Sequence, residues 1–231
     1  MAVKTLVINN KGGVGKSVLT LWIADALAKL NHKVLLLTSD NQNNIFHYSG
    51  VEPVFKKGLD DWIEKESGDI FTLRENLFYI PLKNFKIKSS FKEKFNTFME
   101  KIDSEYDYIF IDASPVLGLN DFFIEKANHY VIPTFLDEAT TDSIVNLLSV
   151  IDKHKVLAVI PNRVGTSMLE KEMYLKLKEI LANDDITLTN AIEQSATLLR
   201  LISRGKTVWE SKYSKALQVQ EIIADVLERL V

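Results

Sequence analysis

The stretch VINNKGGVGKSVLT, residues 7–20, contains the residue types that hold phosphate groups. Its closely spaced glycines let the backbone take positive φ values, so that successive N–H groups can turn toward one anion. Lys16 is placed to neutralise the β and γ phosphates of a nucleotide, and the Ser17 hydroxyl is placed to ligate Mg²⁺. The alternative is a glycine-rich turn that only joins a strand to a helix, but such a string arises by chance in fewer than about one in a thousand sequences. We therefore expect nucleotide binding at this stretch.

The stretch departs from the common phosphate-loop pattern G-x-x-x-x-G-K-[ST] in two ways. Asn10 stands where the pattern has its first glycine, and an additional lysine, Lys11, precedes the glycine pair. Gly13 and Gly15 also form a G-x-G, but Val18 occupies the third glycine position of a dinucleotide-binding motif. The loop therefore indicates a phosphate-loop variant with added positive charge, and it disfavours a dinucleotide fold.

Two carboxylates and one amide lie where apolar runs end. Asp40 follows the run KVLLLT, Asp112 ends the run YDYIFID, and Asn162 follows the run KVLAVIP. Because the carboxyl ends of parallel strands share one edge of a sheet, we expect Asp112 beside the phosphate loop. A carboxylate at this edge can hold the Mg²⁺ shell or orient an attacking water. Taken alone, Asp40 is better interpreted as a strand-end aspartate that caps the next turn.

The string KGGVGKS resembles the deviant Walker A motif of the ParA/MinD family of P-loop ATPases, in which a lysine precedes the glycines. The resemblance implies ATP and Mg²⁺ as cofactors and a homodimer with ATP at its interface. Lys11 would contact the nucleotide of the partner subunit, where its charge offsets the repulsion between two facing triphosphates, so that ATP acts as the dimerising ligand. The nucleotide-binding residues implied are Lys11, Gly12, Gly13, Val14, Gly15, Lys16, Ser17, Val18, Asn162 and Arg163.

The resemblance extends along the chain to the last helix. The family pattern D-x-D-P-Q-x-N reads TSDNQNN at 38–44, with Thr38 and Asn41 in place of the first Asp and the Pro. YDYIFIDASP resembles the family's DYIIIDTPP, and LISRGKTVWE resembles its APSHGKPVxE. Asn162 would read the adenine edge, because an amide offers both a donor and an acceptor. Val18 replaces a second hydroxyl, which leaves the α-phosphate to backbone N–H groups. The catalytic residues implied are Lys11, Lys16 and Asp40, and the metal ligands are Ser17, Asp40 and Asp112.

The chain starts at its first predicted strand, so we expect the short, Soj-like form of a chromosome or plasmid partition ATPase. In this form the ATP-bound dimer binds nonspecific DNA, and a ParB-like centromere-binding protein stimulates hydrolysis, which predicts a cytoplasmic, nucleoid-associated protein. Phosphate contacts by basic residues would make DNA affinity strongly salt-dependent. The family's IPR reads AIEQ here, with Glu193 near the expected arginine. The DNA-binding residues we expect are Arg200, Arg204, Lys206, Lys212 and Lys215.

Other members of the same superfamily are the alternatives. A MinD-like regulator of cell division, positioned on a membrane, needs a basic C-terminal anchor, whereas the polar side of the last predicted helix carries Glu221, Asp225 and Glu228. A nitrogenase-reductase-like electron carrier needs cysteines, and a capsule-type tyrosine kinase needs a C-terminal tyrosine cluster. A metabolic enzyme of the dethiobiotin synthetase type stays open, although Lys11 and the TSDNQNN segment favour a dimerisation switch.

Composition sets the broad class. The 231 residues include 46% hydrophobic and 26% charged residues and no cysteine, and the formal net charge is −3. These values are typical of a globular domain, and they exclude disulfide scaffolds, cysteine nucleophiles and thiolate-bound clusters. The net charge does not predict general affinity for nucleic acid or for an anionic membrane. No apolar run reaches the ~18 residues needed to span a bilayer, so we expect no membrane partner.

The apolar and amphipathic segments around the phosphate loop predict an α/β fold, with a doubly wound, mostly parallel sheet and helices on both faces. Short apolar runs alternate with longer amphipathic stretches over residues 1–231, which predicts one P-loop NTPase domain. The predicted strands are 3–9, 33–38, 77–82, 106–112, 129–134 and 155–161, and the predicted helices are 16–30, 89–103, 138–152, 167–182, 194–203 and 213–230. Two apolar faces are expected, one from Leu19, Ile23, Ala26, Leu27 and Leu30, the other from Phe91, Phe95, Phe98, Met99 and Ile102.

Overall fold

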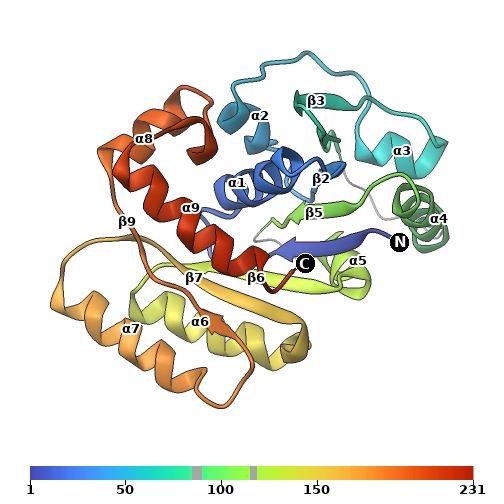
Figure 1. The fold of residues 1–231 in the computed structure, drawn as a ribbon. Coiled ribbons are helices and arrows are strands. Elements are labelled where there is room, and N and C mark those ends of the chain that lie inside the picture. The colour runs from blue at the N-terminus through green and yellow to red at the C-terminus, as the bar shows by residue number, and fades with distance from the viewer. Residues whose placement is uncertain (85–89, 115–118, 231) are drawn as a thin grey trace.

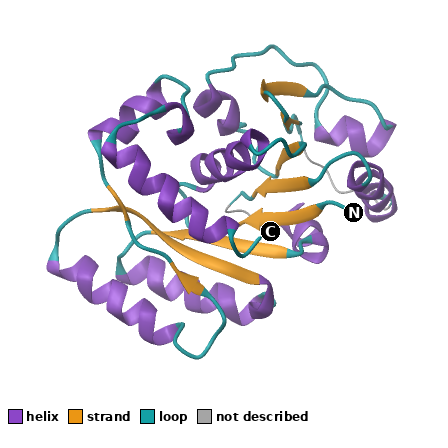
Figure 2. Ribbon diagram, in the orientation of Figure 1, coloured by secondary structure: helices purple, strands orange, loops and turns teal. Residues whose placement is uncertain are grey.

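The computed structural model describes residues 1–84, 90–114 and 119–230 (Figures 1 and 2). Its main sheet has the strand order β3-β4-β2-β5-β1-β6-β7-β8, and β9 pairs with β7 beside it. All pairs are parallel except β3 with β4, so the predicted mostly parallel sheet is confirmed. The strands are β1 Val3–Val7, β2 Val34–Thr38, β3 Phe71–Arg74, β4 Leu77–Tyr79, β5 Tyr108–Asp112, β6 His129–Thr134, β7 Val156–Val164, β8 Thr187–Leu188 and β9 Ile192–Glu193.

The three central strands end together. β1, β2 and β5 are adjacent, with Val7 and Thr38 both opposite Asp112 in the parallel register. Every residue of β2 and β5 is buried, as expected for strands covered by helices on both faces. The segments that follow β1, β2 and β5 therefore leave the sheet at one edge, where a doubly wound fold places its ligands.

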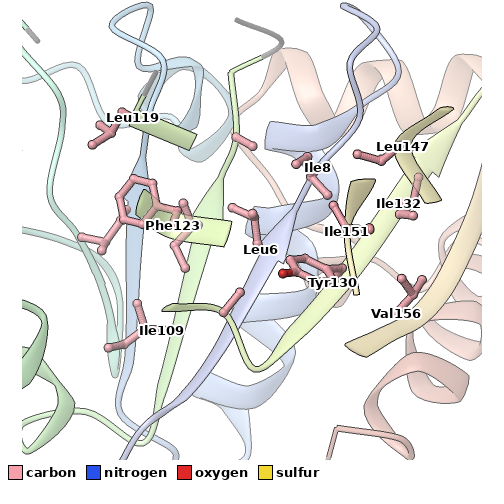
Figure 3. Close-up of a cluster of buried hydrophobic side chains, with 14 of the residues drawn as sticks. Leu6, Ile8, Ile109, Leu119, Phe123, Tyr130, Ile132, Leu147, Ile151 and Val156 are labelled. Atoms are coloured by element: carbon pink, nitrogen blue, oxygen red, sulfur yellow. The ribbon is translucent and has the colours of Figure 1, made fainter. Parts of the chain in front are cut away.

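Helices cover both faces of the sheet, as predicted. One core packs α1, α2, α8 and α9 against the sheet, and the other packs α3 to α7 against its opposite face. Figure 1 shows α9 beside α1, and Figure 3 shows the second core, in which Leu6 and Ile109 lie near Phe123. The helices are α1 Lys16–Lys29, α2 Asn44–Ser49, α3 Leu59–Lys65, α4 Phe91–Asp103, α5 Leu119–Lys126, α6 Glu138–Val150, α7 Met168–Ile180, α8 Ala196–Ser203 and α9 Ser214–Leu227, with short 3₁₀ turns η1 Lys153–Lys155 and η2 Val208–Glu210.

Helix α1 is buried on more sides than its sequence pattern predicts. Leu19, Leu21, Trp22, Ile23 and Ala24 are all buried, because α9 and η2 cover the side that faces away from the sheet. The expectation that Leu30 belongs to the apolar face is wrong, since Leu30 is the residue just beyond the helix and is 62% exposed. The helix therefore holds the phosphate loop from within the protein interior. For α4 the predicted face is confirmed, with all five of its apolar residues buried; the predicted first residue, 89, lies outside the described residues.

The turn between α8 and α9 is fastened to α2 and β3. Gly50 and Gly205 approach so closely that a Cβ on Gly205 would lie 2.2 Å from the Cα of Gly50. Arg74 donates from its two terminal nitrogens to the carbonyls of Ser49 and Gly205, at 3.0 and 2.7 Å, and Nη2 also donates to Glu210 at 3.1 Å. Segments far apart in the sequence thus form one packed unit on this face of the sheet.

Helix α9 packs its apolar stripe into the core. Ala216, Val219, Ile222, Ile223 and Val226 are buried against the α1 side of the sheet. This burial agrees with core packing rather than with a stripe that is free to meet lipid. Within the described residues, none of the helices has the length and apolar character required to cross a membrane.

Helices α2, α3 and α5 and the edge strand β3 are not among the elements predicted from the sequence. These elements have four to eight residues, too short for a clear 3.6-residue or two-residue periodicity. The predicted strand 155–161 is also too short, because β7 continues to Val164 and pairs with Ile192 and Glu193 of β9. Asn162 therefore lies within a strand rather than just past one.

Candidate functional site

The phosphate loop has the predicted strand, loop and helix context, from the end of β1 to the start of α1 at Lys16. Gly13 and Gly15 have φ values of +77° and +99°, which L-residues with side chains rarely adopt. A Cβ on Gly15 would lie 2.2 Å from Asn162 Nδ2, so glycine is needed there for space as well. The first backbone N–H groups of α1 follow directly, and a helix N-terminus favours a bound anion.

An unpredicted residue, Asn9, anchors the start of the loop. It is fully buried; its Nδ2 donates to the Pro133 carbonyl at 2.8 Å, and its Oδ1 accepts from the Lys11 backbone N–H at 2.9 Å. Residues 10–13 are exposed beyond this anchor. The backbone of the loop is thus held to β6 while the side chain of Lys11 projects at the surface.

The two lysines occupy different environments. Lys16 is 7% exposed, and its Nζ donates to the Lys11 carbonyl at 2.8 Å. Burial lowers the pKa of Lys16, while the nearby charges of Asp112 and Asp40 oppose that shift. Lys11 is exposed and carries its charge at the protein surface. Of the two lysines, Lys16 is therefore the one that lies inside the site, within reach of the charges of Asp112 and Asp40.

Asp112 lies at the end of β5 behind the phosphate loop and is 2% exposed. Burial raises the pKa of Asp112 to about 7 and Asp40 adds to the shift, whereas hydrogen bonding by Ser17 and the charge of Lys16 oppose it. Among the described residues its buried Oδ1 atom has no hydrogen-bond partner. A carboxylate oxygen left without a partner beside a serine hydroxyl fits a hard divalent cation such as Mg²⁺.

Asp40 lies in the loop after β2, which is fixed at Thr38, the last residue of that strand. The Thr38 hydroxyl donates to the Asp112 carbonyl at 3.1 Å and accepts from the Asp40 N–H at 3.0 Å. Asp40 Oδ1 accepts from the Gln42 N–H at 3.0 Å, which forms a local turn. Thr38, one of the two departures from the family pattern, therefore ties this loop to the strand that ends in Asp112. The structure brings Lys16, Asp40 and Asp112 together, as the sequence predicts.

A cavity of about 180 Å³ adjoins the phosphate loop and is lined by Val18, Trp22, Tyr48, Asn162 and Arg163 together with residues of β9 and α8. Asn162 Nδ2 donates to the Val14 carbonyl at 2.9 Å, and its Oδ1 accepts from the Arg163 N–H at 3.0 Å. Asn162 thus braces the phosphate loop as well as lining the cavity. Arg163 has a positive φ of 55°, and its guanidinium lies 6.0 Å from the centroid of the Phe135 ring.

The five predicted DNA-binding residues lie in and around α8 and the start of α9. Arg200, Arg204, Lys206 and Lys212 are exposed. Lys215 is half-buried and bonds Glu193 at 2.5 Å, so part of its charge is neutralised. The acidic residue that stands near the family's expected arginine therefore pairs with one of the predicted DNA contacts. The structure keeps four of the five cations exposed on one region of the molecule.

The comparisons with known proteins agree with this geometry. A family model described as an AAA domain matches residues 3–160. A putative septum site-determining protein MinD from Emiliania huxleyi is 28% identical, over 87% of this chain and 78% of that protein. The sporulation initiation inhibitor protein Soj from Bacillus subtilis is 27% identical, over 75% and 76% of the two chains. A putative plasmid partition protein from Borrelia burgdorferi, solved with bound AMPPNP, superposes with a TM-score of 0.78 at 21% identity over the whole of both chains.

Proposed function

Because the chain belongs to this AAA-domain family, and with it to the ParA/MinD group of P-loop ATPases, we propose that it is an ATP-dependent dimerising switch of DNA partitioning. The observation that carries the proposal is the cluster of Lys16, Asp40 and Asp112 at one sheet edge, with Lys11 exposed beside it. In-subunit charges serve the nucleotide, and an exposed lysine is free to reach a second copy. We also propose that residues 1–231 form a single domain.

In the proposed mechanism the backbone N–H groups of residues 12–17 surround the phosphates. Lys16 neutralises the β and γ phosphates, while Ser17 and Asp112 hold the cation. Bound Mg²⁺ supplies positive charge that stabilises the transferring phosphoryl group. Asp40 orients the attacking water toward the γ-phosphate. Lys11 contacts the nucleotide of the partner subunit, so that the dimer forms with ATP and separates after hydrolysis.

DNA binding is the second part of the proposal. Arg200, Arg204, Lys206 and Lys212 are exposed, and they offer a nonspecific phosphate-binding surface. Lys215 contributes less in the free protein because Glu193 holds it. A ParB-like centromere-binding protein stimulates hydrolysis and releases the DNA, and the protein associates with the nucleoid in the cytoplasm.

Nonspecific duplex DNA, titrated by fluorescence polarisation with ATP or ADP, tests the proposal. We expect binding with ATP only, with an affinity that falls steeply as salt rises. Replacing Arg200 and Arg204 by Ala should weaken binding, while Lys178→Ala, on the exposed surface of α7 against the opposite face of the sheet, serves as the matched control. Equal binding in ATP and ADP, or none, contradicts the partition role.

The size of the protein with ATP tests the role of Lys11. Wild type should form a dimer with ATP, and the Lys11→Ala variant should stay a monomer. The matched control is Lys56→Ala, because Lys56 is also exposed but belongs to the loop before α3. A variant that dimerises as wild type does would remove the crossing role.

A MinD-like positioning role is the second candidate, favoured by the 28% identity to the Emiliania huxleyi protein. Such a regulator would bind anionic vesicles with ATP. The buried stripe and acidic polar side of α9 oppose this, because anionic lipid repels carboxylates. Sedimentation with phosphatidylglycerol vesicles separates the two roles, since the partition switch should remain in the supernatant.

A further inference from the structure

Asn43 lies within the TSDNQNN segment, residues 38–44, and adopts a left-handed backbone, with φ 50° and ψ 42°. It is 8% exposed, and it precedes the first turn of α2. Asparagine tolerates this conformation better than most residues, but glycine tolerates it best. The conformation alone therefore does not explain a buried amide at this position.

The side chain of Asn43 uses its full hydrogen-bonding capacity. Nδ2 donates to the carbonyls of Leu82 and Asn41, at 2.7 and 2.9 Å. Oδ1 accepts from the Leu82 N–H at 2.8 Å and from the Tyr79 hydroxyl at 2.9 Å. The amide thus pairs with both backbone groups of Leu82, much as a neighbouring strand would, and the phenol adds a fourth bond.

Tyr79 is a suitable partner because it is fixed in the core. It has no exposed surface, and its ring packs edge-on against Phe46, with centroids 4.8 Å apart. Burial and the charges of Asp112 and Asp40 raise the pKa of the Tyr79 phenol well above its usual value, so its hydroxyl remains a donor. Because the charges of Asp112 and Asp40 contribute to this pKa shift, the Tyr79 phenol lies near both carboxylates of the site.

The loop that carries Asp40 is therefore held at both ends. At its start the Thr38 hydroxyl bonds the Asp112 carbonyl, and at its end the Asn43 amide bonds Leu82. The Asn43 N–H also donates to the Asp40 carbonyl at 3.2 Å. Asp40 stands between two anchors, one on β5 at Asp112 and one at Leu82 in the segment that follows β4.

We propose that Asn43 is a positioning residue for ATP hydrolysis, which holds Asp40 in register with Asp112 through Leu82 and Tyr79. The inference rests on the proposed ATPase function. The hydrogen bonds of the Asn43 side chain go to Asn41, Tyr79 and Leu82, none of which is proposed to bind the nucleotide, so loss of the amide should slow hydrolysis and leave ATP binding intact. Positioning groups act in this way, because small displacements of a reacting group reduce the rate strongly.

The Asn43→Gly variant tests the inference, because glycine keeps the positive φ and removes only the amide. Single-turnover hydrolysis of Mg·ATP should slow about tenfold or more, with the Kd for ATP within about twofold of wild type. Tyr79→Phe removes one bond of the four and should slow hydrolysis about fivefold, as the loss of one net hydrogen bond implies. This second variant keeps the ring, so it tests the clamp even where Asn43→Gly folds poorly.

Asn76→Gly is the matched control. Asn76 also has a positive φ, 60°, but it lies in the β3–β4 turn, where its carbonyl accepts from the Val34 N–H at the opposite end of β2. The Asn76→Gly variant should hydrolyse ATP at the wild-type rate. Rate and affinity that fall together in Asn43→Gly and Tyr79→Phe indicate only a folding role and overturn the inference, as does an unchanged rate in both. A wild-type chain that binds ATP but never hydrolyses it overturns the proposed ATPase function itself, and with it the role of the clamp.

Discussion

Replacing Asp112 by Asn should stabilise the nucleotide-free protein at neutral and alkaline pH. Burial raises the pKa of Asp112 to about 7, whereas an aspartate in an unfolded chain has a pKa of about 3.9. Between these values the folded state keeps a proton that the unfolded state has released. The contribution of this group to stability is complete below pH ~4 and is lost as pH rises through ~7.

The size of the effect follows from the difference in pKa. A difference of about 3 corresponds to about 4 kcal/mol in the free energy of unfolding. Asparagine cannot ionise, so the stability of the Asp112→Asn variant lacks this dependence. The variant should therefore gain up to about 4 kcal/mol over wild type as pH rises from 4 to 8, because the wild-type chain must then keep a charge buried beside Asp40.

Urea denaturation at several pH values, with EDTA and without nucleotide, measures this difference. In the difference in free energy of unfolding between Asp112→Asn and wild type, the contributions of all other titrating groups that the substitution does not affect cancel. Asp225→Asn, at an exposed position on α9, is the control and should show a constant difference from wild type. With Mg·ATP, wild type should become the more stable of the two proteins, because Mg·ATP should bind folded wild type more tightly than the folded Asp112→Asn variant. A difference between Asp112→Asn and wild type that does not change with pH, or that favours wild type at high pH, would refute the reasoning.

Three further predictions concern the loop, the α8–α9 turn and the basic surface. Gly15→Ala should abolish ATP binding, because the added Cβ would lie 2.2 Å from Asn162 Nδ2 at a backbone φ of +99°. Adding Asn162→Ala to this variant should recover part of the lost Tm but should not restore ATP binding. A Gly15→Ala variant that binds ATP as wild type does contradicts this prediction. Arg74→Met should lower the free energy of unfolding, measured in urea, by about 2–4 kcal/mol, because the variant loses bonds to three carbonyls and one carboxylate. A loss under about 0.5 kcal/mol would show that these bonds add little. Glu193→Gln should release Lys215 and steepen the salt dependence of DNA binding by about one in slope, whereas an unchanged slope places Lys215 outside the DNA surface.

The sequence was sufficient where one local requirement decides the residue type. Glycine at 13 and 15 reflects backbone angles, and the buried runs of β2 and β5 reflect helices on both faces. Asp112 could be placed because a buried apolar strand rarely ends in a carboxylate unless that group has a charged or polar partner. The register of adjacent parallel strands then brought it to the phosphate loop. Periodicity failed at Leu30, where one extra residue beyond α1 continued the apolar pattern into solvent.

The sequence was insufficient where partners are distant. Asn43 bonds a residue 39 positions away, Arg74 one 131 positions away, and the Asp25 carboxylate accepts from the Thr207 hydroxyl across 182 positions at 2.5 Å. Each of these polar residues reads locally as part of a turn, an edge strand or a helix surface. Only the packed fold shows that Asp25 is fully buried and that burial raises its pKa. No local pattern of spacing carries that information.

The contact between Gly50 and Gly205 has a consequence for the order in which the protein forms during translation. The first glycine leaves the ribosome long before the second, by roughly 8 to 30 s at 5–20 residues per second. During that interval α2 has no α8–α9 turn to pack against, and the outer face of α1 lacks its cover, including the Trp209 indole that donates to the Trp22 carbonyl at 2.7 Å. The nascent chain therefore exposes apolar surface next to the phosphate loop until the segment around Gly205 and Trp209 has been made. The helix that follows the phosphate loop is thus covered by a residue that is translated 187 positions after the residue it bonds.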